Sequence, residues 1–82
     1  MALNIRVLGG GCANCHNLEA NARAAAEQLG VEATVEHSGD RAVYARYGLL
    51  ATPGLVINDR LVSGGRVPSA AEIVTYLTNA LA

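Results

Sequence analysis

The chain has 82 residues, of which 51% are hydrophobic, and six basic and seven acidic groups give it a formal net charge of −1. This length supports one small domain with a single core, and the charge balance leaves no basic surface of the kind that binds nucleic acid or anionic membranes. No apolar run approaches the roughly 18 residues of a membrane-spanning helix, and no signal-peptide pattern opens the sequence, so we expect a cytoplasmic protein with no nucleic-acid or membrane partner.

The first half of the chain predicts a strand, a helix and a second strand. Residues 3–8 form an apolar run typical of a buried strand, and three glycines follow it. Over 13–29 apolar residues recur at helical spacing on one face, and Gly30 is a typical residue to end a helix. Apolar and polar residues alternate over 31–36, which predicts a half-buried strand.

The second half of the chain predicts a helix at 41–47, strands at 55–57 and 61–63, and a last helix that begins at 69–72. Asp40 is a favourable N-cap for the first of these helices, and Gly48 is a typical residue to end it. The hairpin loop at 58–60 lacks the usual glycine, and Ser69 and Glu72 have the spacing of a capping box. The order β-α-β-α-β-β-α requires parallel strands in the first β-α-β unit and an antiparallel final pair.

The only two cysteines, Cys12 and Cys15, stand between the first expected strand and the first expected helix. The unpaired N–H groups and the dipole at a helix start favour the thiolate form of a cysteine there. In a cytoplasmic protein such a close pair is typical of redox or metal-binding chemistry. A disulfide that closes so small a loop would constrain the unfolded chain only weakly. The pair therefore indicates reactivity rather than a structural crosslink.

A Thr-Pro pair, Thr52-Pro53, stands just before the expected hairpin. The Cys-x-x-Cys segment and this Thr-Pro pair, in this element order, resemble the thioredoxin fold. More closely, the chain resembles the short thioredoxin-like and glutaredoxin-like family of small redox-active disulfide proteins. Segments 5–9, 11–15, 52–53 and 64–68 carry the resemblance, which covers essentially the whole chain. It implies a single α/β domain over 1–82, with a βαβαββα thioredoxin-like fold and a four-stranded mixed sheet.

The resemblance implies a thiol–disulfide oxidoreductase in which the Cys12–Cys15 disulfide is the redox-active group and no other cofactor or metal is needed. Cys12 would attack a disulfide of a protein substrate, and Cys15, one helical turn further on and more buried, would resolve the mixed disulfide. A reductase resembling thioredoxin reductase would then restore the dithiol. Ala13 and Asn14 match neither the Gly-Pro of thioredoxin nor the Pro-Tyr of glutaredoxin, so they do not indicate the reduction potential.

The same resemblance implies a substrate-binding surface. Pro53 would be a cis proline beside the cysteines, and Thr52 would present its backbone to an extended substrate segment. Gly64 and Gly65 match the Gly-Gly before the last helix of glutaredoxins and would let a substrate backbone come close. Arg66 follows them, where glutaredoxins have an acidic residue that holds glutathione, so a protein reductase is favoured over glutathione.

Several departures from thioredoxin are visible. The first strand has no acidic residue to lie behind the resolving cysteine, and Gly11 replaces the tryptophan that precedes the Cys-x-x-Cys of thioredoxin. Leu49 and Leu50, close to Thr52, could form an apolar docking rim, or one of them could belong to the core.

Other functions for the same sulfurs remain open at this point. Residues 12–16 match the CxxCH of c-type haem attachment, but no export signal is visible and the chain has no Phe or Trp to enclose a haem. His16 could instead act as a base or a charge that adjusts Cys15, but we expect it to be an exposed histidine in the first turn of the helix. A Cu(I) or zinc carrier would use the same two thiolates, although such domains have the order β-α-β-β-α-β and no role for the Thr-Pro pair. A non-catalytic thioredoxin-like binding module is the third possibility.

Overall fold

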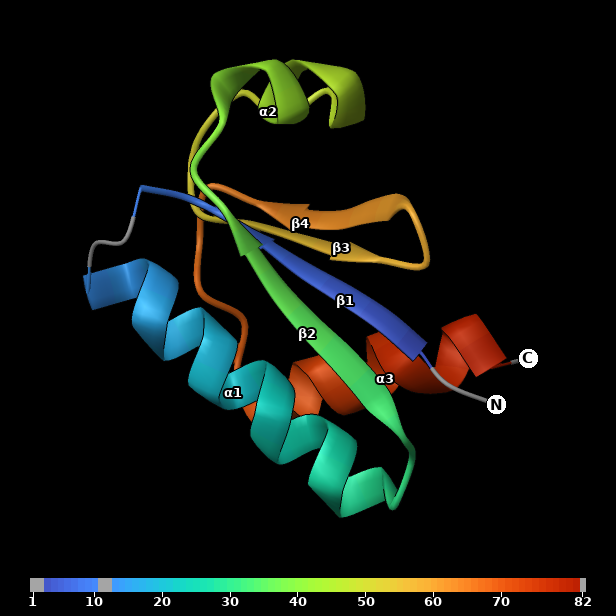
Figure 1. Ribbon diagram of the computed structural model, residues 1–82. Coiled ribbons are helices and arrows are strands. Elements are labelled where there is room, and N and C mark those ends of the chain that lie inside the picture. The colour runs from blue at the N-terminus through green and yellow to red at the C-terminus, as the bar shows by residue number, and fades with distance from the viewer. Residues whose placement is uncertain (1–2, 11–12, 82) are drawn as a thin grey trace.

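The computed structural model describes residues 3–10 and 13–81 (Figure 1). Its elements are β1 (Leu3–Leu8), α1 (Ala13–Leu29), β2 (Ala33–Ser38), α2 (Arg41–Tyr47), β3 (Gly54–Ile57), β4 (Arg60–Gly64) and α3 (Ala70–Leu81). The predicted order is confirmed. The predicted second strand began two residues too early, because the Val31 amide donates to the Ala26 carbonyl (3.2 Å) and so closes the end of α1. Pairing with β1 begins only where Ala33 lies opposite Leu3.

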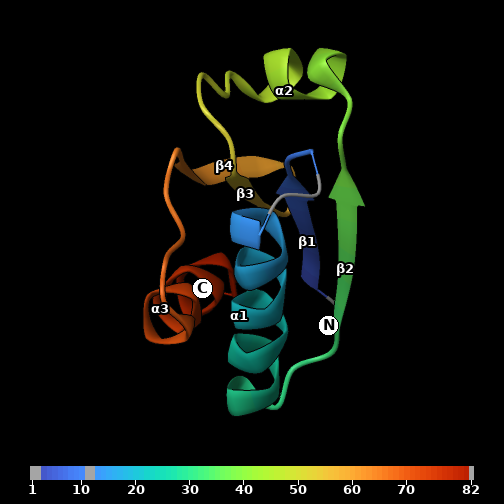
Figure 2. The same ribbon diagram turned by 90° about the vertical axis from the view of Figure 1, so that its left-hand side faces the viewer.

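The four strands form one mixed sheet in the order β2-β1-β3-β4. β1 runs parallel to β2 and antiparallel to β3, and β4 is antiparallel to β3, which confirms the predicted four-stranded mixed sheet. The two long helices, α1 and α3, lie together on one side of the sheet, and α2 lies on the other side (Figures 1 and 2). Among the helices that the structure describes, none is long and apolar enough to cross a membrane.

The main core lies between the sheet and the helices α1 and α3. In β1 the alternate side chains of Leu3, Ile5 and Val7 enter it, as the two-residue period of a strand requires. Alanines occupy much of the buried face of α1, so this helix packs close to the sheet. The remaining buried members of this core are Leu18, Ala22, Ala25, Ala26, Leu55, Ile57, Ile73 and Leu77.

A smaller cluster lies on the opposite face of the sheet, under α2. Leu8, Leu49 and Val56 are its buried members, and side chains of α2 and β4 pack against them. All four residues of β3 are consequently buried, because β3 is covered on both faces. This explains why β3 is apolar throughout instead of alternating.

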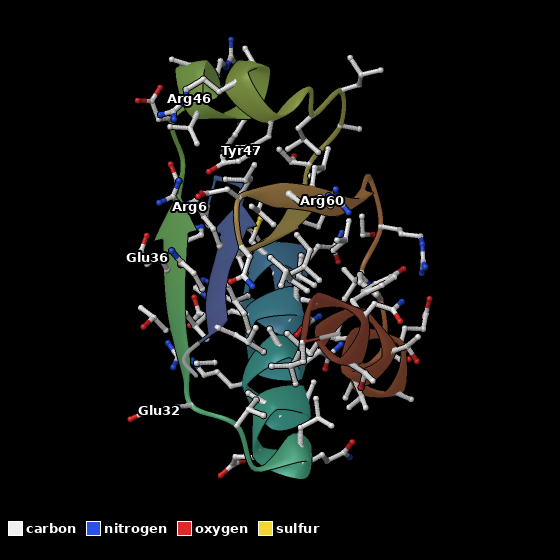
Figure 3. The ribbon with its side chains drawn as sticks, turned by 90° about the vertical axis from the view of Figure 1, so that its right-hand side faces the viewer. Arg6, Glu32, Glu36, Arg46, Tyr47 and Arg60 are labelled. Atoms are coloured by element: carbon white, nitrogen blue, oxygen red, sulfur yellow. The ribbon has the colours of Figure 1, made fainter. Side chains whose placement is uncertain are left out.

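A polar network ties α2 to this face of the sheet (Figure 3). Arg6 of β1 donates to the Tyr47 hydroxyl (2.9 Å) and forms an ion pair with Glu36 of β2 (3.0 Å). The Tyr47 hydroxyl in turn donates to the carboxylate of Asp59 in the hairpin loop (3.1 Å). The guanidinium carbon of Arg6 lies 5.9 Å from the centre of the Tyr47 ring, within the range of a cation–π contact. The last residue of α2 is therefore held directly to β1 and to the hairpin loop, and through Arg6 it is linked to β2.

The hairpin between β3 and β4 turns without glycine. Its loop is shorter than predicted, because Arg60 already belongs to β4. Asn58 and Asp59 both have positive φ angles, 50° and 65°, a conformation that these two residue types tolerate better than most. Asn58 also exchanges two hydrogen bonds with the backbone of Asn4, at 2.8 Å and 3.0 Å. These bonds fix the loop to the start of β1.

The predicted capping box opens α3. The Ser69 hydroxyl accepts from the Glu72 amide, and the Glu72 carboxylate accepts from the Ser69 amide, each at 3.2 Å. Arg66 forms an ion pair with the same carboxylate. The hydrogen bond from Arg66, and after it the bond from the Ser69 backbone, lowers the pKa of Glu72 to about 2.

The depressed pKa of Glu72 makes a pH-dependent contribution to stability. Because the pKa is lowered in the folded state, the contribution is present above pH 4.5, the ordinary value, and is lost as the pH falls toward 2. We expect urea unfolding to show that Glu72→Gln is less stable than the unsubstituted protein at pH 7, with a difference that shrinks toward pH 2. Glu27→Gln, which removes an exposed carboxylate without an ion pair among the described residues, is the control. An equal difference for Glu72→Gln at pH 7 and pH 2 would contradict this interpretation.

Candidate functional site

The candidate site lies at the end of the sheet where β1 ends, α1 begins and β3 begins (Figure 1). Cys15 is in the first turn of α1, and only 2% of its surface is exposed. Because side chains on a helix point toward its N-terminus, the Cys15 side chain is directed to the end of β1. Cys15 is thus buried, and its being more buried than Cys12 stays a prediction. Cys12 and Gly11 lie outside the described residues.

Gly9, the first residue after β1, lies between Cys15 and Pro53. A Cβ atom at Gly9 would collide with the Cys15 Sγ and would lie 3.3 Å from the Cys15 Cβ and 3.9 Å from the Pro53 Cβ. The Gly9 amide donates to the Ser38 carbonyl at the end of β2 (2.9 Å), which fixes the backbone at this point. The absence of a side chain at Gly9 therefore permits the cysteine and the proline to approach each other.

The sequence predicts no packing role for Gly9: the three consecutive glycines indicate the connection between strand and helix, and Gly9 also ends one of the segments that carry the family resemblance. The available signal was the position of a glycine directly after a buried strand and before a Cys-x-x-Cys. Gly10, by contrast, is exposed, and a Cβ atom there would meet no atom within 4 Å. Of these two adjacent glycines, only Gly9 lacks the space for a side chain.

The Thr52-Pro53 pair joins this site at the start of β3. The peptide bond between Thr52 and Pro53 is cis. Thr52 is exposed and Pro53 is buried. The Pro53 carbonyl accepts a hydrogen bond from the amide of Gly65 (2.9 Å). The fold thus brings Thr52, Pro53, Gly64 and Gly65 together, and both glycines are exposed to solvent.

Leu49 and Leu50 have opposite environments. Leu49 is buried, and its methyl groups lie 2.8 Å from the positions that Cβ atoms would occupy at Gly54 and Gly64. These two glycines pair with each other across β3 and β4, so together they make room for the leucine. Leu50 is completely exposed. The first leucine belongs to the core and the second lies on the surface.

A surface groove of about 730 Å³ runs beside Thr52. Its walls are α2, the segment 49–52 and the two glycines Gly10 and Gly39, which follow β1 and β2. Arg41 is the one charged residue among the described residues that line it. We call this feature the α2 groove.

The remaining residues singled out in the sequence lie outside this arrangement. His16 is exposed on α1, as expected. Arg66 is held by Glu72, whose hydrogen bond raises the pKa of the arginine, and by the Tyr76 hydroxyl (3.4 Å). No charged residue is buried in the part of the chain that the structure describes, so none of these lies behind Cys15. Within the same residues, no group of three or more His, Cys, Asp or Glu side chains could hold a metal ion.

The chain is similar to known proteins over nearly its whole length. A family profile described as thioredoxin domain matches residues 3–78. The chain is 41% identical over 76 residues to a thioredoxin of Methanothermobacter thermautotrophicus, covering 93% of this chain and 99% of that protein. It is 34% identical over 77 residues to a thioredoxin of Methanocaldococcus jannaschii, covering 94% and 88%. The fold is similar to that of the J-Trx1 fragment of ERdj5, with a TM-score of 0.66 and 22% identity over 96% of this chain and 43% of that fragment.

The contact between Gly9 and Cys15 gives a direct test of the site geometry. We expect Gly9→Ala to lower the free energy of unfolding of the reduced protein by about 1–3 kcal/mol, because the added methyl group overpacks the Cys15 side chain. Gly10→Ala, which has open space around its Cβ position, should change it by less than about 0.5 kcal/mol. Urea denaturation measures both values. Equal effects of the two substitutions would show that the position of Cys15 does not depend on Gly9.

Proposed function

The chain belongs to the thioredoxin domain family, and from this premise we propose that Cys12 is its nucleophile and Cys15 its resolving cysteine. The function of the chain is thiol–disulfide oxidoreduction, because its sequence is 41% and 34% identical to two thioredoxins over nearly its whole length. Disulfide-containing proteins are therefore its general class of substrate, and a reductase is its general class of partner. The assignment of steps to the two cysteines is the part that we propose.

The proposed reaction transfers two electrons to the substrate. The Cys12 thiolate attacks one sulfur of the substrate disulfide, forms a mixed disulfide and releases the first substrate thiol, which takes a proton. The Cys15 thiolate then attacks the Cys12 sulfur and releases the second substrate thiol. The substrate disulfide has become a dithiol, and Cys12 and Cys15 have become a disulfide. A reductase resembling thioredoxin reductase restores the dithiol.

The burial of Cys15 is the observation that carries this assignment. With 2% of its surface exposed, Cys15 is shielded from the disulfide of a partner protein. A thiol on a neighbouring residue of the same chain can still reach it, and Cys12 is three residues away in the sequence. The residue after Cys12 is the first of α1, a helix of 17 residues, whose N-terminal dipole favours thiolates in this region.

Thr52, Pro53, Gly64 and Gly65 are the proposed substrate-binding residues. Thr52 is exposed beside the buried Pro53, and the hydrogen bond from Gly65 to the Pro53 carbonyl holds the two segments together. A substrate segment in extended form can lie along the Thr52 backbone, and the exposed backbone of the two glycines would let it come close. This recognition uses backbone rather than side chains, which suits an enzyme that accepts many proteins.

Three finer expectations also belong to the proposal. We favour a protein reductase over glutathione, because Arg66 stands where glutaredoxins have an acidic residue and is already paired with Glu72. The Cys12–Cys15 disulfide would be the only redox group, without metal. The chain would act in the cytoplasm, where the reductive direction is expected.

Single-cysteine variants test the assignment. We expect Cys15→Ser to accumulate a mixed disulfide with a disulfide-containing peptide, because the resolving thiol is missing. Cys12→Ser should form none and should reduce the peptide at least about 100-fold more slowly than the unsubstituted protein, since the exposed nucleophile is lost. Mass spectrometry of the acid-quenched reaction measures the adduct. Peptide reduction by Cys12→Ser at the unsubstituted rate would overturn the roles given to the two cysteines.

A further inference from the structure

The α2 groove contains one fully exposed apolar side chain. Leu50 is 100% exposed, although its neighbour Leu49 is buried. A single exposed leucine is common on protein surfaces and is not informative alone. Leu50, however, lines the groove and stands two residues before Thr52, where the proposed substrate segment would lie. A segment bound at Thr52 would therefore pass close to this leucine.

The same groove carries a positive charge that forms no ion pair with any described residue. Arg6, Arg23 and Arg66 each form an ion pair with a glutamate. Arg41 forms none with any residue that the structure describes, and neither does Arg46, the other charged residue of α2.

Asp40 precedes Arg41 in the sequence but forms no ion pair with it. The Asp40 carboxylate instead accepts a hydrogen bond from the Ala42 amide as the N-cap of α2 (2.9 Å). Glu36 and Asp59 are held by Arg6 and Tyr47 on the sheet. A cation, Arg41, and an exposed apolar side chain, Leu50, thus line the same groove as Thr52.

From these contacts we infer that the α2 groove selects disulfide partners that carry an acidic residue and an apolar residue on the segment containing the reactive cysteine. Arg41 pairs with the partner's carboxylate, and Leu50 contacts its apolar side chain. This inference rests on the proposed function, because the groove matters only if substrates lie along Thr52. It adds side-chain selectivity to a site that otherwise recognises backbone.

Two disulfide peptides that differ only in one glutamate or glutamine test the charge. We expect the unsubstituted protein to reduce the glutamate peptide with a kcat/KM about 2–5-fold higher, the range of an exposed ion pair, and the preference should weaken with added salt. Arg41→Gln should remove the preference and Arg41→Glu should reverse it. Arg46→Gln is the matched control, because it removes the same charge from the same helix outside the groove, and it should keep the preference.

The apolar contact is tested by Leu50→Ser with peptides that carry leucine or serine beside the cysteine. We expect the variant to raise KM for the leucine peptide about 5-fold, because a partly buried leucine contact is lost, and to leave KM for the serine peptide unchanged. Urea unfolding followed by tyrosine fluorescence checks that every variant folds. We expect all of them to fold, because Arg41, Arg46 and Leu50 are exposed in the structure.

A small neutral disulfide, bis(2-hydroxyethyl) disulfide, separates this inference from the proposed function. It is too small to fill the groove, so every Arg41 and Leu50 variant should reduce it at the unsubstituted rate. If the unsubstituted protein reduces neither the small disulfide nor the peptides, the proposed function fails. If the unsubstituted protein reduces all the peptides equally, or if Arg46→Gln also loses the preference for the glutamate peptide, the inference about the groove is wrong and the proposed function stands.

Discussion

The close approach of three segments at Gly9 is the constraint on which the site depends. Leu8, the last residue of β1, pairs with Gly54, the first residue of β3, so the end of one strand lies beside the start of the other. Pro53 is the residue before β3, and the Cys15 side chain of α1 packs against Gly9, the residue after β1. A side chain at Gly9 would occupy the space that the cysteine fills. The topology of the sheet thus places the proline beside the cysteine, and the glycine allows the contact.

A second set of glycines shapes the surface next to this contact. Gly54 and Gly64 accommodate Leu49, and Gly65 donates to the Pro53 carbonyl. As a result the proposed substrate surface consists mainly of backbone and small side chains. A surface of this kind accepts many partners, and any discrimination among them has to come from its margin. Leu50 and Arg41 are the side chains at that margin, in the α2 groove.

The sequence predicted the element order because hydrophobic periodicity and cap residues report local structure directly, whereas the burial of Cys15 was expected only from the family resemblance. It placed the second strand too early, since alternation at Val31 and Glu32 cannot reveal that the Val31 amide closes α1. It also could not separate Leu49 from Leu50, two identical neighbours of which only the first meets the paired glycines. The role of Gly9 was missed for a related reason: a glycine in the sequence does not show which atoms it faces.

The central claim is that Cys12 and Cys15 act as one redox couple within a single chain. Equilibration of the purified protein with glutathione redox buffers, followed by acid quenching and alkylation of the remaining thiols, tests it most directly. The account predicts a single two-electron transition in which both cysteines of a monomer become protected from alkylation together. The transition should be absent from the Cys12→Ser and Cys15→Ser variants. The claim would be contradicted if the dithiol failed to oxidise at every ratio of reduced to oxidised glutathione. It would also be contradicted if the protein bound Cu(I) so tightly that Cu(I) prevented disulfide exchange.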